Sequence, residues 1–195
     1  IGFRPGSNPI VFLETALRKH GLDPQKDVKL LNNIGIPARA GAWMAGQGEY
    51  GIFLEPEAGE LVRNGKGYIV ASVGHEVGQV DYTVFTATDK YIRDNPKVIQ
   101  AWTDVVARAE KYVKDTPAAT LTPQIMTFFP GMDQGAVTEA IERYKQYQIW
   151  KTSPLVTAEA MAKLQDMLVA SAVMKETARV KYEDVVVADF AKKVP

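Results

Sequence analysis

The chain has 195 residues, and its 23 lysines and arginines balance its 23 aspartates and glutamates. This neutral balance argues against a nucleic-acid-binding protein and against a protein that binds anionic membrane surfaces, because both need an excess of positive charge. The chain has no cysteine, which excludes disulfides, thiolate metal sites and a cysteine nucleophile. No apolar run is long enough to cross a bilayer, and the length suits one sizeable domain or two small lobes.

The chain is predicted to open with a short strand, the polar loop Arg4–Asn8 and then a helix. Asn8 is predicted at the N-cap and Pro9 at the first helical position, where its missing N–H costs no hydrogen bond. Gly21 is predicted to end the helix in a left-handed conformation, just after the basic residues 18–20. Free N–H groups and the helix dipole favour an anion at the start of such a helix. An ordinary strand–helix connection is the alternative interpretation of this loop.

Short apolar runs alternate with helix signals through the first 72 residues. The predicted strands are a run that begins at Ile1 and the segments Val28–Leu31, Tyr50–Leu54 and Tyr68–Ser72. Short helices are predicted between them, at residues 37–45 and 57–63. This alternation predicts an α/β fold with a parallel-dominated open sheet over residues 1–72 and helices on both of its faces.

Three loops of this predicted sheet fall at one edge. Ligands of open α/β sheets bind beyond the carboxyl ends of the strands, which places residues 4–8, 33–37 and 55–56 around one rim. Glu55 stands at the end of a strand and before a proline, and it is equally suited to cap the helix that starts near Glu57. The candidate ligand-binding residues are Arg4, Gly6, Ser7, Asn8, Ile36 and Glu55.

Other motifs do not indicate catalysis, a cofactor or a metal. The segment Gly46–Gly51 fits G-x-G-x-x-G, but it follows a predicted helix and opens a predicted strand, so it is interpreted as a turn and not as a dinucleotide site. His20 belongs to a helix end, and His75 lacks the second histidine of H-E-x-x-H. A zinc or copper role for His75 is less expected than a solvated loop histidine. Ser7 and Ser72 have no histidine–acid pattern nearby, so no nucleophilic triad is predicted.

The second part of the chain is predicted to be mainly helical. Residues 82–88 form a predicted strand, and Asn95 and Pro96 then begin a long helix. The apolar stripe of that helix is Val98, Ala101, Trp102, Val105, Val106, Ala109 and Val113. Thr122, Asp133 and Thr157 are predicted to begin three further helices, and residues 182–190 a terminal element. The change in composition near residues 74–82 is the predicted domain boundary. It divides the chain into an α/β lobe at residues 1–76 and a second part at residues 77–195, which consists of a crossing strand and the helical part of the first lobe.

Several stretches together resemble a known family. They are GFRPGSNPIVFLETALRKHGLDPQKDVKLL, AGQGEYGIFLEP, GKGYIVASVG, ATDKYIRDNPKVIQAW, LTPQIMTFFPGMDQ and LQDMLVASAVMKETARVKYEDVV. In this order they resemble solute-binding proteins of nitrate/sulfonate/taurine-type ABC transporters, over essentially the whole chain. The resemblance implies two lobes of the type II periplasmic binding fold that close on a small anionic or polar solute, and a transporter permease as partner. Ser7 and Asn8 match the ligand loop at the helix start, and Glu55 matches the acidic position before proline at the cleft.

The resemblance also implies a segment ahead of Ile1 that builds the opening strands and helices of the first lobe. This chain lacks that segment, so a partial fold is expected, with the stripe at residues 98–109 and a second stripe at Met161, Leu164 and Leu168 short of cover. The helices could cover these faces by packing on one another or by exchange with a second copy, and self-association is expected. The implied location is periplasmic, or extracellular and membrane-anchored, with the signal segment outside this chain.

Two alternatives from other classes stay open. The first is an enzyme of the same fold that makes the thiamin pyrimidine. That enzyme relies on a cysteine-rich motif, which this chain does not contain, and no enzymatic activity is therefore expected. The second alternative is a ligand-sensing or protein-interaction module.

Overall fold

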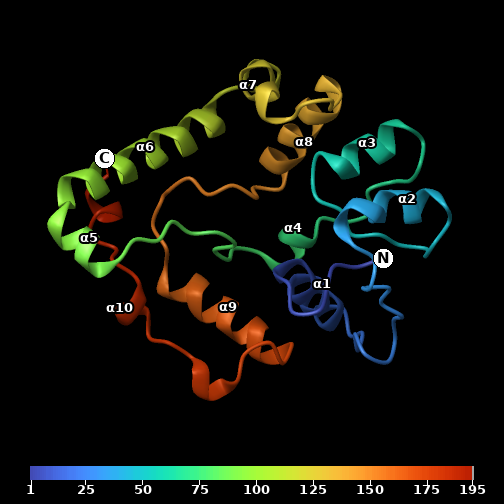
Figure 1. The fold of residues 1–195 in the computed structure, drawn as a ribbon, viewed down its shortest axis with the longest axis horizontal. Helices are drawn as coiled ribbons and strands as arrows, with labels where there is room; N and C mark the ends of the chain where they lie inside the picture. Colours follow the sequence, from blue (N-terminus) through green and yellow to red (C-terminus); the bar gives the residue numbers. More distant parts are fainter. Residues whose placement is uncertain (195) are drawn as a thin grey trace.

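The computed structural model describes residues 1–194, and all the regular secondary structure in that range is helical (Figure 1). The first helices in chain order are α1 (Asn8–Lys19), η1 (Ile36–Ala38), α2 (Arg39–Met44), α3 (Glu57–Arg63), α4 (Val73–Val77) and α5 (Asp89–Asp94). They are followed by α6 (Pro96–Asp115), α7 (Ala118–Ile125), η2 (Met126–Phe128), α8 (Gln134–Gln146), α9 (Ala158–Ala170), η3 (Glu176–Ala178), α10 (Tyr182–Val185) and η4 (Ala191–Lys193). The η elements are short 3₁₀ helices.

The predicted parallel sheet is absent. Residues 1–194 contain no strand, so the α/β prediction for residues 1–72 and the crossing strand predicted at residues 82–88 are both wrong. The segments are instead irregular and share isolated backbone hydrogen bonds. Gly2 N donates to Leu31 O at 2.9 Å, and Ile52 N donates to Ile1 O at 3.0 Å. Single bonds of this kind do not make the repeated ladder that defines a sheet.

Exposure of the apolar runs gives the physical reason for this difference. Tyr68 is 91% exposed, and Val70, Val84 and Phe85 are also exposed. Strand propensity mostly measures how well a side chain fits between neighbours on a pleated, half-buried surface. These β-branched and aromatic side chains lack such neighbours, and their segments therefore remain irregular.

Helix ends follow the sequence signals more closely. Asp133 accepts a hydrogen bond from Ala136 N at 2.9 Å, and Thr157 accepts one from Ala160 N at 3.1 Å, which confirms both predicted N-caps. Gly21 has φ +78°, as a left-handed helix end requires. The structure places Ser7, not Asn8, at the N-cap of α1, and it begins α7 before Thr122, with Pro123 inside the helix.

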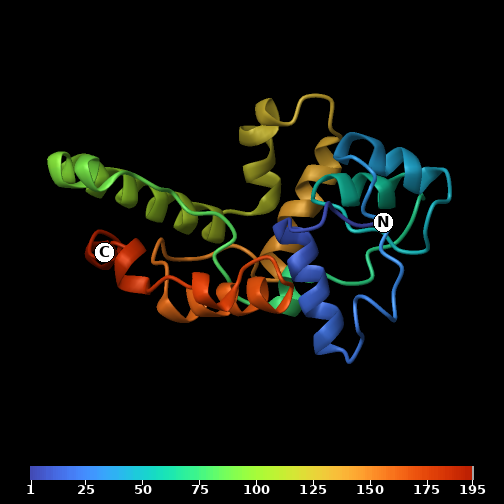
Figure 2. The same cartoon turned by 60° about the horizontal axis from the view of Figure 1, so that its bottom comes forward.

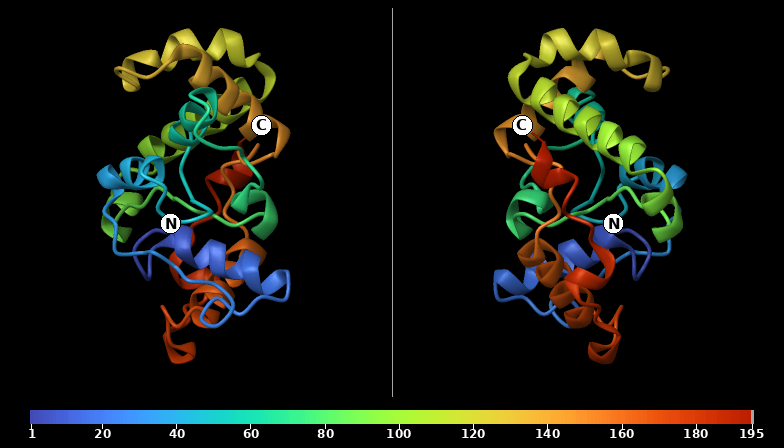
Figure 3. Two further views of the ribbon diagram at one scale, coloured as in Figure 1. Left: turned by 90° about the vertical axis from the view of Figure 1, so that its right-hand side faces the viewer. Right: turned by 90° about the vertical axis from the view of Figure 1, so that its left-hand side faces the viewer.

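Two separate apolar clusters hold the helices together. The first joins α1, α4 and α9 through Val11, Phe12, Val77 and Met167. Leu164 and Leu168, from the second stripe that was expected to lack cover, pack against this cluster. The other cluster joins α7 and α8 through Ala118, Leu121, Val137 and Ile141. Figure 3 shows the α7–α8 pair and α9 at opposite ends of the molecule, in agreement with two clusters in place of one.

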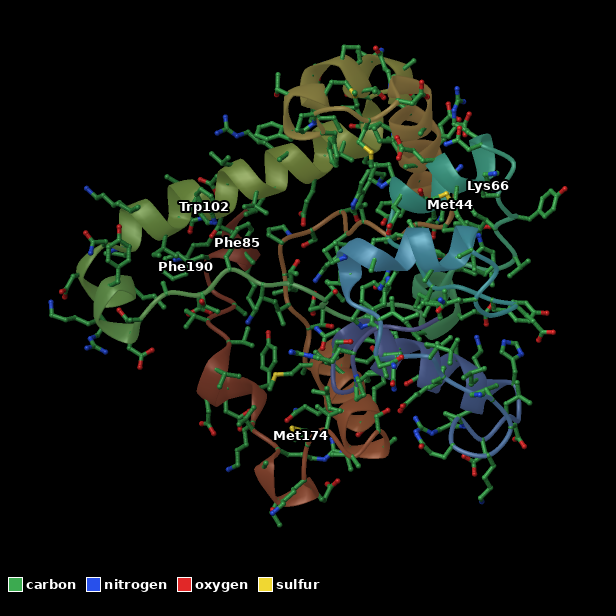
Figure 4. The ribbon with its side chains drawn as sticks, turned by 45° about the vertical axis from the view of Figure 1, so that its right-hand side comes forward. Met44, Lys66, Phe85, Trp102, Met174 and Phe190 are labelled. Carbon is green, nitrogen blue, oxygen red and sulfur yellow. The ribbon has the colours of Figure 1, made fainter. Side chains whose placement is uncertain are left out.

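Helix α6 is the least covered long element. It extends away from α1 and from the α7–α8 pair (Figure 2), with α5 and η4 beside it, and none of its residues is buried. Trp102 is 51% exposed and meets Phe85 edge-on, with 5.1 Å between the ring centroids. Figure 4 shows this pair together with Phe190, whose carbonyl accepts a hydrogen bond from Gln100. Within residues 1–194, no helix combines the length and the apolar character needed to cross a membrane.

The two environments predict different responses to truncation. Ile141→Ala should lower the free energy of unfolding by about 2–5 kcal/mol, because it opens a cavity in the α7–α8 cluster. Val98→Ala, on the exposed side of α6, should change the free energy of unfolding of the dilute, monomeric chain by less than about 0.5 kcal/mol. Urea unfolding followed by circular dichroism measures both values. Equal effects at the two positions would contradict the described division between a covered and an uncovered helix face.

Candidate functional site

The loop before α1 leaves the positive end of the helix open. Ser7 Oγ donates to the carbonyl of Arg4 at 2.6 Å, and the Ser7 carbonyl accepts from Ile10 N and Val11 N. Gly6 has φ +76°, a conformation that suits glycine and turns the chain into the helix. Within residues 1–194, neither the N–H of Gly6 nor that of Asn8 has an acceptor. The first turn of α1 also contains no acidic residue, so its partial positive charge is not neutralised locally.

A cavity of about 410 Å³ lies beside this loop. Its lining includes Gly6 from the loop, Glu14 from α1, Asn32, and Ser171 from the end of α9. Glu14 is 7% exposed and accepts a hydrogen bond from Arg18 at 3.1 Å, and Arg18 also donates to Ser171 at 3.1 Å. The ion pair offsets the charge of the buried carboxylate, and the volume lies in the range of small-molecule sites.

Glu55 joins α3 to α8 by its two carboxylate oxygens. Oε2 accepts from Gly59 N at 3.1 Å, and Oε1 accepts from Arg143 Nε at 2.7 Å. Glu55 therefore caps α3, which is one of the two roles that the sequence allows for it. It accepts from the first turn of α3 although it precedes the N-cap residue, Pro56. The hydrogen bond that Arg143 donates to Glu55 raises the pKa of Arg143, and burial raises the pKa of the neighbouring Tyr144.

Gly59 allows this close approach of α3 and α8. A Cβ atom at this position would lie 2.5 Å from Arg143 Nη2 and 3.2 Å from Glu55 Oε2. The first distance is shorter than any real contact of a Cβ atom. The missing side chain of Gly59 thus makes room for the Glu55–Arg143 pair.

Arg39, at the start of α2, was not singled out in the sequence, and it is the most unusual polar residue of the structure. It is 1% exposed, and its guanidinium carbon lies 3.5 Å from the centroid of the Phe3 ring and 5.4 Å from that of Phe53. The nearest carboxylate oxygen belongs to Glu57, 3.7 Å from Nη2. Nε, Nη1 and Nη2 are all buried without a hydrogen-bond partner among the described residues. Burial lowers the pKa of Arg39 and raises the pKa of Glu57.

The surroundings of Arg39 compensate its burial only in part. Removal of a cation from water costs several kcal/mol even after relaxation. A desolvated cation–π contact returns about 2 kcal/mol, and the Glu57 carboxylate attracts the charge across a distance too long for a hydrogen bond. The guanidinium therefore has unused hydrogen-bonding capacity, which is rare for a buried charged group.

Residues next to the three predicted loops meet around Arg39, although the sheet edge that was predicted to bring those loops together is absent from residues 1–194. Phe3 precedes the loop at residues 4–8, Arg39 follows the loop at residues 33–37, and Phe53 and Glu57 lie on either side of residues 55–56. A single arginine among the small residues of α2 was the only available sequence signal. Of the six predicted ligand residues, three lie in the loop before α1, Asn8 is the first residue of α1, and Glu55 belongs to the α3–α8 contact. Ile36 is 63% exposed, and the ligand role of all six stays a prediction.

The two histidines have other neighbours. His20 Nε2 lies 2.9 Å from Glu76 Oε2, which links the end of α1 to α4. The His75 ring lies against Tyr147, with 5.4 Å between the centroids. No group of three or more histidine, aspartate or glutamate residues suited to a metal ion occurs in the described range, 1–194. The segment 46–51 is a loop after α2, as the interpretation of its glycines as a turn predicts.

The Glu55–Arg143 pair should contribute measurably to stability. Glu55→Gln should lower the free energy of unfolding by about 1–3 kcal/mol, because it removes the charge that faces a largely buried guanidinium. Asp94→Asn, which breaks an exposed pair with Lys90, is the matched control and should leave stability unchanged. Chemical denaturation at pH 7 measures the two effects. An equally small effect of both variants would show that Glu55 does not hold α3 against α8.

The chain is similar to a known protein family and to a curated protein. A family model described as the NMT1-like family matches residues 1–127. A protein of Bacillus subtilis (strain 168) named "Putative binding protein YtlA" is 32% identical over 194 residues, a match that covers 100% of this chain and 58% of that protein. The chain thus spans less than two thirds of the length of this relative. No solved structure matches the chain.

Proposed function

Because this chain belongs to the NMT1-like family, we propose that it is the solute-binding part of an ABC importer and captures a small anionic or polar solute at the start of α1. The observation that carries the proposal is the open positive end of α1, where the N–H groups of Gly6 and Asn8 have no acceptor within residues 1–194. Such an end attracts anions. The adjoining cavity of about 410 Å³ offers space for a small solute.

The comparisons support this proposal over an enzyme. The Bacillus subtilis relative is named "Putative binding protein YtlA", and we propose that this chain delivers its solute to a permease. The proposal therefore includes an ABC transporter permease as partner and a periplasmic or extracellular, membrane-anchored location. The chain also lacks the cysteines on which the pyrimidine-forming enzyme of this fold relies.

Asn8→Asp tests the site because it should change stability and affinity in opposite directions. A negative charge in the first turn of α1 should raise the free energy of unfolding by about 0.3–1 kcal/mol at low salt. The same charge should weaken the binding of an anion by about tenfold or more. Isothermal titration calorimetry with nitrate, methanesulfonate and taurine on the full-length natural chain measures the affinity, and urea unfolding measures the stability.

Asn64→Asp is the matched control, because it makes the same chemical change at the end of α3 and not at a helix start. It should leave the affinity for each anion unchanged. An unaltered affinity of the Asn8→Asp variant, with binding otherwise intact, would remove the solute from the start of α1. Absence of binding for every solute of a broader anionic and polar panel would overturn the proposed function itself.

The proposal also includes self-association through α6. Val98, Trp102 and Val105 leave an apolar stripe about half exposed along this helix, and a second copy can cover it. Sedimentation velocity of the 195-residue chain should show a concentration-dependent dimer that Trp102→Glu dissociates. Tyr68→Glu, at an aromatic residue exposed outside α6, should not affect it. A monomer at all concentrations would contradict this part of the proposal.

A further inference from the structure

The guanidinium of Arg39 combines full burial with complete lack of hydrogen bonds. Its three nitrogens are buried, and within residues 1–194 none donates to an acceptor. The Phe3 ring lies 3.5 Å from the guanidinium carbon, so this contact uses one face of the planar group. The five N–H bonds of an arginine lie in its plane and not on its faces. The stacking therefore fixes the plane and leaves the donors available.

The donor pattern of a fixed guanidinium suits a particular class of ligand. Its parallel N–H bonds match two oxygens of one carboxylate, sulfonate or phosphate group, and bidentate pairs of this kind are among the strong hydrogen bonds of proteins. The Phe3 and Phe53 rings around the cation exclude water, which strengthens an electrostatic contact at this place. An uncharged solute gains much less from the same environment.

Among residues 1–194, the one carboxylate that pairs with Arg39 is poorly placed to use these donors. Glu57 Oε2 lies 3.7 Å from Nη2, beyond hydrogen-bond distance. The Glu57 side chain is 32% exposed, whereas that of Arg39 is 1% exposed. Glu57 thus balances the charge of Arg39 from the more exposed side, and it can turn outward to solvent without losing a hydrogen bond to the guanidinium.

We propose that Arg39 binds the oxyanion group of a small solute, a carboxylate, sulfonate or phosphonate, which replaces Glu57 at the guanidinium. The inference rests on the proposed function, since the ligand is the same class of solute, and it names the cationic group that recognises it. The place of Arg39 agrees with this role, because the segments that lead to all three predicted loops meet around it.

Entry of the solute requires movement of the segment at residues 50–54, which carries Phe53. This segment has no helical structure, and its backbone is joined to Ile1 by two hydrogen bonds, from Ile52 N to the Ile1 carbonyl and from Ile1 N to the Tyr50 carbonyl. Segments held by few hydrogen bonds open at low cost in free energy. Displacement of the Phe53 ring uncovers the guanidinium while Phe3 keeps it in place.

Matched pairs of probes test the charge requirement. Calorimetry on the full-length natural chain compares methanesulfonate with methanesulfonamide and acetate with acetamide, which differ in charge but little in size. The anions should bind and the amides should not. Arg39→Lys keeps the charge but loses the bidentate geometry, so it should weaken anion binding about tenfold or more. Arg179→Met is the control, because Arg179 already pairs with Asp166 and Glu176, and it should leave binding unchanged.

Arg39→Met and Glu57→Gln separate a ligand role from a structural one. Arg39→Met removes an uncompensated buried charge, so it should abolish anion binding while the melting temperature stays the same or rises. Glu57→Gln removes the carboxylate that opposes an incoming anion, so it should strengthen anion binding about threefold or more. A structural ion pair predicts the reverse, namely a lower melting temperature for both variants and no gain in affinity.

The outcomes are distinguishable from those of the proposed function. Anion binding that is lost in Asn8→Asp but unchanged in Arg39→Lys would overturn the role of Arg39 and leave the proposed function intact. Weaker anion binding in Glu57→Gln would also overturn it, because it would show that Glu57 helps to hold the ligand. Failure of the unaltered chain to bind any anionic or polar probe would overturn the proposed function and the inference together. If Arg39→Met does not fold, Arg39→Lys and Glu57→Gln decide the matter alone.

Discussion

The contact of α1 with α4 and α9 brings together parts of the chain that are far apart in sequence. Val11 and Phe12 of α1 meet Val77 of α4 and Met167 of α9 in one apolar cluster. No strand ladder joins the first 72 residues, so their position depends on helix contacts such as this one and the α3–α8 contact through Glu55 and Arg143. At its edge, Glu76 receives hydrogen bonds from Lys19 and lies close to His20. The loop at the start of α1 is therefore anchored by the helix that follows it, which gives the candidate anion site a defined backbone geometry.

The features that the sequence predicted correctly are helix ends, which depend on residues close together in the chain. Asp133 and Thr157 cap their helices by accepting hydrogen bonds from N–H groups three residues away, and Gly21 ends α1 because its own backbone allows a positive φ. Strands depend on partners elsewhere in the chain. Tyr68 and Phe85 have the side chains of strand residues, but both remain exposed and find no ladder. Periodicity and composition indicate the local preference of such segments, but they do not show whether a partner strand is present.

The same distinction applies to the candidate site. The loop at residues 4–8 could be recognised from its position before a proline-initiated helix, which is a local pattern. The environment of Arg39 could not, since it arises from Phe3, Phe53 and Glu57, which come from separate segments. An arginine in a short helix of small residues has the same sequence appearance whether it is solvated or buried. Only its contacts reveal that its charge is removed from water and its donors are unused.

Gly59 shows how the smallest residue can limit which sequences the fold accepts. The space next to its Cα is filled by the Glu55–Arg143 pair, and any side chain at this position meets Arg143 Nη2 first. The arginine cannot move aside freely, because its Nε is bound to Glu55. A substitution here must separate the pair or push α3 away from α8. Position 59 thus restricts its own side chain although it contributes no side-chain contact, and the restriction arises from the Glu55–Arg143 pair beside it.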